Sequence, residues 1–302
     1  MAVNLAAIRD QLFPGLRGIE GKYPMIPTQW SKVFDQGTSK MAIERTLENR
    51  YLGLAQVKSE GGATSFDNAA GQRFVYQQEH TELGLGYAIT RKAIDDNLYK
   101  DAFNPSNLGL MESFQQTKEI LGAALLNTAA TYNPAFQADA VPLISTAHPI
   151  DGGTYANRPT AEVDLSETAI QNALLQIRGF KDQANLKVFA RGRRLLVPPA
   201  LEYVATRLTK TKLRPGTTDN DVNAVMVTQG VPDGYEVLDF LTSNFSWFIK
   251  TSIKGLLYLQ RVAFETDMQV DFTTMNLLCL AYERYSFGYY NPRAIWGTVP
   301  TS

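Results

Sequence analysis

The segment LISTAHPIDGGTYANRP, residues 143–159, places the residue types of a hydrolytic triad close together. Ser145, His148 and Asp151 could supply a nucleophile, a general base and an orienting carboxylate. These groups act only when the fold arranges them in space, and Ser145 lacks the G-x-S-x-G turn that exposes a nucleophile. The Asp-Gly-Gly run that begins at Asp151 favours a tight turn. We therefore interpret the segment as a structural loop, with a hydrolase that uses Ser145 and His148 as the alternative.

Other sequence motifs for catalysis or ligand binding are missing. A phosphate-binding loop needs a glycine-rich turn that ends in Gly-Lys-Ser/Thr, and the chain has no such string. A dinucleotide-like run begins at Gly84, but Ile89 stands where its third glycine should be. His80 is isolated, and no HExxH pattern occurs. The sequence therefore predicts no catalytic residues, no cofactor and no metal site, so the chain is not expected to be an enzyme.

The composition is that of a globular chain without a strong net charge. Hydrophobic residues make up 44% of the sequence, and 29 Lys+Arg against 30 Asp+Glu give a net charge of -1. This balance gives no overall attraction to nucleic acid or anionic lipid, so any DNA contact is expected to be local or non-specific. Cys279 is the single cysteine, which excludes an internal disulfide. No apolar run reaches membrane-spanning length and no signal peptide is evident, so neither a membrane location nor secretion is expected.

The first half of the chain predicts an arm and a hairpin. Residues 1–42 are rich in proline and glycine and should form an extended arm. From Arg45 to Thr90, two β-rich runs flank the tip GGATSFDNAAG, which predicts one long hairpin. An isolated two-stranded hairpin is marginal in water, so something outside the chain's own core should pack on it.

Three helices are predicted after the hairpin. A long, continuous helix should start at Asn104-Pro105-Ser106 and cover about residues 107–131. A second helix should have Asp164 as its N-cap and end at Gly179. The third should follow a short strand in RRLLVPPALEYVATRL, residues 193–208, and the chain from Gly234 onward should form antiparallel strands. These elements predict an α+β fold.

Four segments in this order resemble a known family: STAHPIDGGTYANRP, DLSETAIQNALLQIRGFKD, RRLLVPPALEYVATRL and AYERYSFGYYNPRAIW. The succession is similar to the major capsid proteins of tailed double-stranded DNA phages, in particular the Mu-like major head subunit family, and is strongest over residues 145–208. The resemblance implies the bacteriophage Hong Kong 97 type capsid fold. It also implies a structural protein that self-assembles into the hexamers and pentamers of an icosahedral shell that encloses the genome. Another phage structural module, such as a tail-tube or decoration protein, is the alternative and would lack the long helix.

The resemblance also implies a division of the chain. Residues 1–42 would be the N-terminal arm, and residues 43–90 the E-loop, a hairpin that lies over an adjacent subunit. Residues 91–139 would belong to the peripheral domain with its spine helix, and residues 140–257 to the axial domain at the capsomer centre. Residues 258–302 would be terminal strands that return to the peripheral domain.

Partners follow from the same resemblance. The chain would bind other copies of itself, a portal, an optional cement protein and packaged double-stranded DNA. A separate scaffolding protein is also expected, since no helical extension precedes the arm. The protein would reside in the virion capsid after assembly in the host bacterial cytoplasm. The hairpin is expected to serve contacts between subunits and to contribute little to folding of the monomer. Its expected contact residues are Lys58, Glu60, Phe66, Asp67, Arg73, Phe74, Tyr76 and Glu79.

Overall fold

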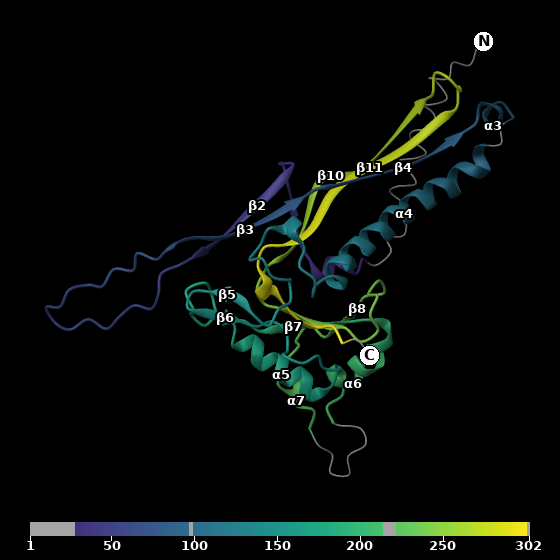
Figure 1. The fold of residues 1–302 in the computed structure, drawn as a ribbon. Coiled ribbons are helices and arrows are strands. Elements are labelled where there is room, and N and C mark those ends of the chain that lie inside the picture. Colours follow the sequence, from purple (N-terminus) through teal and green to yellow (C-terminus); the bar gives the residue numbers. More distant parts are fainter. Residues whose placement is uncertain (1–27, 97–98, 214–221, 301–302) are drawn as a thin grey trace.

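The structure is a computed structural model that describes residues 28–96, 99–213 and 222–300. It consists of a long sheet with a helix beside it, a body with a second sheet, and a loop that projects on the other side (Figure 1). Most of the expected N-terminal arm, residues 1–27, lies outside the described residues. The mixture of helices and sheets confirms the predicted α+β class.

The long sheet contains four strands: β1 (Asp35–Thr38), β4 (Thr81–Ile89), β10 (Leu256–Val270) and β11 (Leu277–Tyr289). Their order is β1-β10-β11-β4, with β1 parallel to β10 and the other pairs antiparallel. One face is covered by α4 (Tyr99–Asn127), whose Leu110 and Phe114 pack on Ala281 of β11. The Phe114 ring also meets Phe264 of β10 edge-on, with centroids 5.2 Å apart. The covered face explains why buried and less buried residues alternate along β11.

The body contains a second four-stranded sheet: β7 (Gly192–Val197), β8 (Tyr235–Val237), β9 (Trp247–Thr251) and β12 (Ile295–Thr298). Three helices lie beside it: α5 (Glu167–Arg178), α6 (Glu202–Lys210) and α7 (Ala224–Val227). The apolar stripe of α5 includes Ile170 and Ile177, which are fully buried in one cluster with Leu195 and Trp247. The runs Leu195–Val197 of β7 and Trp247–Ile249 of β9 are buried throughout, so they are continuously apolar and show no alternation.

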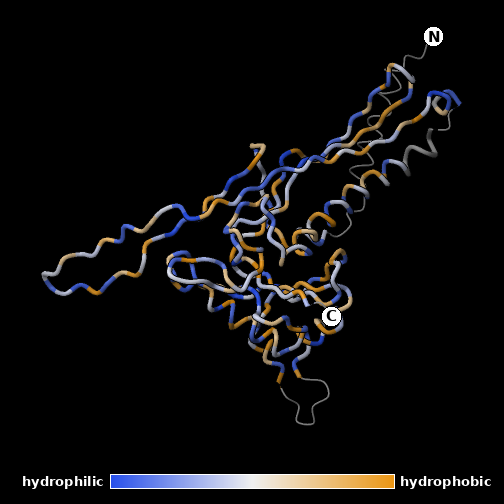
Figure 2. The backbone as a smooth tube through the Cα atoms, viewed as in Figure 1, coloured by the Kyte–Doolittle hydropathy of each residue, from blue (hydrophilic) through white to orange (hydrophobic). Residues whose placement is uncertain are grey.

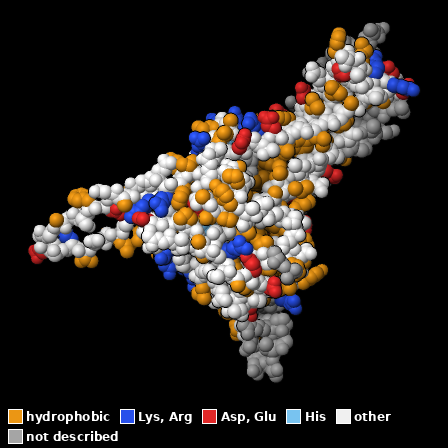
Figure 3. All heavy atoms as spheres, viewed as in Figure 1, with side chains coloured by type: hydrophobic (Ala, Val, Ile, Leu, Met, Phe, Trp, Pro, Cys, Tyr) orange, Lys and Arg blue, Asp and Glu red, His pale blue; other side chains and the backbone are white. Residues whose placement is uncertain are grey.

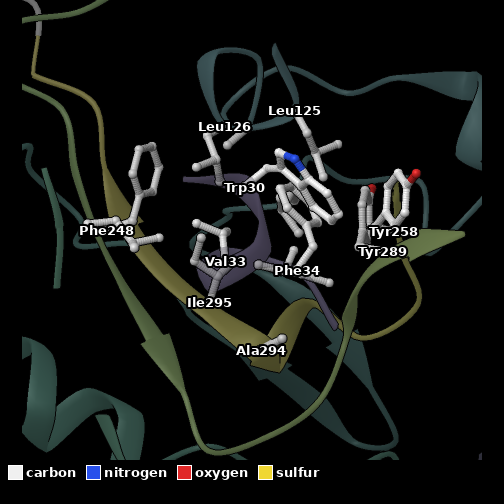
Figure 4. Packing of buried hydrophobic residues seen from close by; sticks show 14 of the residues in the cluster. Trp30, Val33, Phe34, Leu125, Leu126, Phe248, Tyr258, Tyr289, Ala294 and Ile295 are labelled. Carbon is white, nitrogen blue, oxygen red and sulfur yellow. The ribbon is translucent and has the colours of Figure 1, made fainter. Parts of the chain in front are cut away.

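A buried cluster joins the long sheet to the body (Figure 4). Its centre is Trp30 of α2 (Trp30–Val33), whose ring lies 4.3 Å from Tyr258 and 5.7 Å from Phe287 by centroid distance. Phe248 of β9 and Ile295 of β12 enter the same cluster from the second sheet. The two sheets therefore share one hydrophobic core at their junction.

The predicted long hairpin is wrong in its second half. β2 (Ile43–Arg50) pairs with β3 (Gly71–Glu79), but this pairing ends at Glu79, and after His80 the chain continues as β4, which pairs with β11 instead of β2. Residues 51–70 contain no strand. The reason is burial, since Leu83 and Tyr87 of β4 pack under α4, whereas a free hairpin would leave them exposed.

The long helix is continuous, as predicted, but it begins earlier. α4 starts at Tyr99 and includes Pro105, which the sequence placed at the helix start. A proline inside a helix removes one backbone hydrogen bond, and it can bend a helix without ending it. Among the helices of the described residues, none is long and apolar enough to cross a membrane.

The α5 helix has the predicted end at Gly179 but a different N-cap. The side chain of Ser166 accepts a hydrogen bond from the Ala169 amide at 3.1 Å, so Ser166 takes the capping role expected of Asp164.

The two candidate caps can be compared directly by mutation. Ser166→Ala is expected to lower the free energy of unfolding by about 1 kcal/mol, because it leaves a helix amide without its acceptor. Asp164→Ala, the matched control, should change it by less than about 0.5 kcal/mol, as for an ordinary surface position. Urea denaturation of the unassembled subunit measures both values. A larger loss for Asp164→Ala would contradict the assignment of the cap.

The end of the chain divides between the two sheets. The expected division grouped residues 258–302 with the peripheral domain, and this is wrong for the last strand, because β12 pairs with β9 of the second sheet. Trp296 of β12 is buried against Trp247 of β9, with ring centroids 5.0 Å apart, and this contact holds the strand there. The short elements are α3 (Arg91–Asp95), β5 (His148–Ile150), β6 (Gly153–Tyr155) and the 3-10 turns Pro134–Phe136, Pro199–Leu201 and Pro292–Ala294.

Candidate functional site

Ser145, His148 and Asp151 do not form a catalytic site. The Ser145 hydroxyl oxygen accepts a hydrogen bond from the Ala147 amide at 3.1 Å, and Asp151 pairs with Arg50 at 2.9 Å. Among the described residues, His148 bonds to neither of them, and its ring is fully buried. Nor do three metal-ligating side chains gather anywhere in the described part of the chain. The arrangement therefore gives Ser145 no general base.

His148 is instead the centre of a buried polar network. Its Nδ1 lies 2.6 Å from Asp139 Oδ2 and its Nε2 lies 3.0 Å from Asn157 Oδ1. The amide orientation of Asn157 is settled by its other bonds, because Oδ1 accepts from the Ser145 amide. Both ring nitrogens thus lie within hydrogen-bonding distance of a side-chain oxygen. The Asn157 Nδ2 donates to the carbonyls of Leu143, Pro292 and Ile295.

Arg293 connects this network to β2. Its guanidinium carbon lies 4.4 Å from the centroid of the Tyr155 ring, which also stacks on His148 with centroids 4.9 Å apart. Its Nη1 donates to Glu48 Oε1 at 2.6 Å, and the Tyr76 hydroxyl donates to the other oxygen of Glu48 at 3.2 Å. Burial, followed by the charge of Glu48, raises the pKa of Tyr76, so its hydroxyl remains a donor. The β2–β3 pair is therefore tied to the body by buried, charge-assisted hydrogen bonds.

Beyond this anchor, residues 51–70 leave the body as a long loop (Figures 1 and 2). One hydrogen bond crosses it near its base, because the Asp67 carboxylate accepts from the Gly53 amide at 2.7 Å, and the same carboxylate accepts locally from the Ala69 amide at 2.9 Å. These bonds to the Ala69 and Gly53 amides lower the pKa of Asp67. Hydrophobic side chains project along the loop (Figure 3). Five of them are exposed: Tyr51, Leu52, Leu54, Val57 and Phe66.

The expected contact residues fall into three groups. Lys58, Glu60 and Phe66 are exposed in the loop, as an interface with another molecule requires. Asp67 is exposed but engaged within the loop, and Arg73 and Glu79 are exposed on β3.

Phe74 and Tyr76 form the third group, and they correct the expectation for β3. Tyr76 is only 2% exposed and belongs to the core at the junction of the sheets, where Phe74 packs beside it. Side chains alternate along a strand, so β3 presents one face to this core and the other to solvent. The hairpin base thus contributes to folding of the monomer. Leu52, Leu54 and Val57 are exposed as well and were not among the expected contact residues, although apolar residues in a run without a core partner are a signal for them.

His80, the residue between β3 and β4, provides a test by pH. Its Nε2 lies 2.9 Å from Ser39 Oγ and its Nδ1 3.0 Å from Ser286 Oγ. Burial, and then the charge of Arg284, lowers the pKa of His80 from its ordinary value of 6.5, while Glu44 opposes them. The unfolded state therefore takes up a proton first, so stability should fall as the pH drops below about 6.5.

We expect the free energy of unfolding to decrease from about pH 7 to about pH 5.5 more steeply for the wild type than for His80→Gln. Urea denaturation at several pH values measures the two slopes. Since the chain has only one other histidine, His148, which both proteins keep, the difference between the slopes reports His80. Equal slopes would contradict the prediction.

Comparison with known proteins agrees with a structural role. The sequence profile of a family described as phage capsid protein matches residues 78–297. No curated protein matched the sequence. The fold is similar to the capsid of an empty GTA particle, with a TM-score of 0.55 and 12% identity over 91% of this chain and 90% of that chain.

Two phage structures give similar values. A structure from Mycobacterium phage Che8 has a TM-score of 0.52 and 12% identity, covering 91% of this chain and 92% of its own. The procapsid of bacteriophage JBD30 has a TM-score of 0.51 and 14% identity, covering 98% of this chain and 76% of its own. At such identities the likeness establishes the fold alone, and it is the Hong Kong 97 type.

The family match spans more than half of the chain and includes α4, most of the body and three strands of the long sheet, β4, β10 and β11. It confirms the phage capsid resemblance, whereas the narrower Mu-like group stays a prediction. The described residues contain no assembled catalytic group, and an anchored loop is directed away from the core. By its family match, the chain belongs to the phage capsid protein family and is a major capsid protein of the Hong Kong 97 type.

Proposed function

We propose that this major capsid protein builds hexamers and pentamers of an icosahedral shell by laying residues 51–70 over a neighbouring copy. The observation that carries the proposal is the exposure of large apolar groups on a loop with no core of its own. Val57 is 103% exposed and Phe66 87%. Burying such groups against another subunit is favourable by about 1.5–3 kcal/mol each, and a shell repeats the contact many times.

The proposed domains follow the two sheets. The loop and the β2–β3 pair would be the E-loop, and α4 with the long sheet would be the spine helix and peripheral domain. The second sheet, including β12, would be the axial domain near the capsomer centre. The junction core around Trp30 would then hold these two domains at a set angle.

The remaining partners are proposals of the same kind. The chain would use a separate scaffolding protein and a portal, with a cement protein as an optional addition, and would contact the packaged double-stranded DNA non-specifically. It would assemble in the host bacterial cytoplasm and reside in the virion capsid. No enzymatic role is proposed, because the buried contacts of His148 leave it no access to a substrate.

Negative-stain electron microscopy tests the function. The full chain, produced alone and together with the scaffolding protein of its own gene cluster, is expected to form closed, roughly isometric shells. Long tubes would favour the tail-tube alternative. Particles that form only on a preassembled shell of another protein would favour the decoration alternative.

A further inference from the structure

A second surface, distinct from the loop, carries an excess of positive charge. A groove of about 220 Å³ lies between α2, β7 and the end of β9. We call it the basic groove and define it by Lys32, Arg193, Arg194, Lys250 and Lys254, with Asp35 and Asp233 as its carboxylates. Five cations against two carboxylates leave an excess of three positive charges in the lining.

The strand register places two of these cations against each other. Arg194 of β7 is the direct antiparallel partner of Lys250 on β9, so their side chains share one face of the sheet. Like charges in such a pair destabilise a sheet. Lys250 is partly compensated by Asp35 at 3.5 Å, but within the described part of the chain Arg194 donates only to the backbone carbonyl of Lys32, at 3.0 Å. The fold thus holds a guanidinium in place without giving it an anion.

The other cations of the groove also include both paired and unpaired side chains. Lys32 pairs with Glu236 at 2.6 Å, and Arg193 pairs with Asp233 at 3.0 Å. Lys254 is exposed and, like Arg194, has no carboxylate partner among the residues that the structure describes. Two uncompensated cations therefore face one hollow.

The rest of the lining distinguishes between kinds of partner. Ile253 is its one aliphatic side chain, and the other neutral residues are Thr251 and Ser252. Interfaces between proteins have an apolar centre, whereas interfaces with nucleic acid are more polar and strongly positive. A groove of about 280 Å³ beside β2 offers a contrast, because Leu47, Val188 and Tyr290 line it.

We propose that the basic groove binds a phosphate group of the packaged DNA, with Arg194 and Lys254 as its principal contacts. The inference rests on the proposed function for the presence of DNA, while the groove itself is independent of the loop. Arginine and lysine both bind phosphate, and the planar guanidinium can donate two parallel hydrogen bonds to it. Binding would supply the anion that Arg194 lacks among the described residues.

Fluorescence anisotropy with a short labelled DNA duplex tests the proposal on the full, unassembled chain. Each phosphate contact contributes about 0.9 to the slope of log K against log salt, so two contacts change Kd by about 12-fold between about 50 and about 200 mM salt. The double variant Arg194→Gln/Lys254→Gln is expected to lose that part of the salt dependence. The matched control Lys187→Gln/Arg207→Gln removes two exposed cations outside the groove and should keep it.

Three outcomes would overturn the proposal: no measurable DNA binding by the wild type, equal salt slopes for the two double variants, or intact DNA binding with lost self-association. The last would make the groove a subunit contact. Inorganic phosphate is expected to compete with the duplex more strongly than chloride at equal ionic strength, and equal competition would contradict a phosphate site. Micrographs of the same proteins separate the two ideas. A wild type that binds DNA through the groove without forming shells would refute the proposed function alone.

Discussion

Replacing residues 51–70 with Asn-Gly is expected to give a soluble, folded subunit that forms no closed shells. The register makes this deletion possible, because Arg50 and Gly71 are cross-strand partners and can flank a two-residue turn. The buried Tyr76 and the Glu48–Arg293 contact lie outside the deleted segment and should keep β2 and β3 in place. Arg50 loses Asp67 but retains Asp151. Urea denaturation should therefore show a change in the free energy of unfolding within about 1 kcal/mol.

Two further variants identify which loop contacts matter. Changing Leu52, Leu54, Val57 and Phe66 together to Ser keeps the loop length but removes most of its exposed apolar surface, and shell formation should be lost or strongly reduced. Changing Lys58 and Glu60 to Ser is the control and should leave shells intact, because exposed ion pairs contribute only about 0–1 kcal/mol each. Electron microscopy and sedimentation measure assembly. Normal shells from the subunit that lacks the loop would refute the interface role.

Arg293→Met is expected to lower the free energy of unfolding by about 3–5 kcal/mol, because it leaves a buried charge without its partner. The Arg293 side chain is 4% exposed and that of Glu48 14%. The change also removes the hydrogen bond from Arg293 to the Lys181 carbonyl at 2.6 Å and the contact with the Tyr155 ring. The β2–β3 pair would lose its charged anchor, so we expect the yield of closed shells to decrease as well.

An exposed arginine provides the matched control. Arg193 forms two hydrogen bonds to Asp233, at 3.0 and 3.1 Å, but its side chain is 51% exposed. Arg193→Met should therefore cost at most about 1 kcal/mol. Adding Glu48→Gln to Arg293→Met removes the unpaired charge and should restore part of the lost stability. Equal losses for the two single arginine variants would show that burial of the Glu48–Arg293 pair does not increase its contribution to the free energy of unfolding.

Local signals were sufficient for several elements and for the family. The end of α5 at Gly179, the strand and helix in residues 193–208 and the continuity of α4 could be predicted because hydrophobic period and turn residues act over a few positions. Two residues that can cap a helix, Asp164 and Ser166, precede α5, so the sequence left the position of the cap ambiguous. The structure gives this role to Ser166. The ordered motifs identified the phage capsid family before any contact was known.

Pairing over long distances could be decided only by the tertiary structure. β3 and β4 read as one strand, yet they separate at His80 because α4 covers β4 and the junction core takes Tyr76. The partners of His148 are Asp139 and Asn157, not the Ser145 and Asp151 that its sequence neighbourhood suggested.

The charged anchor of the loop shows the physical reason most clearly. Glu48 and Arg293 are 245 positions apart, and each residue alone looks like an ordinary surface charge. A hydrophobic period records which face of an element is buried, but it carries no record of which distant element covers that face. The sequence by itself therefore determined the elements and the family. Strand partners, the burial of the Glu48–Arg293 pair and the separation of the loop from its anchor were decided only when both sheets closed on a common core.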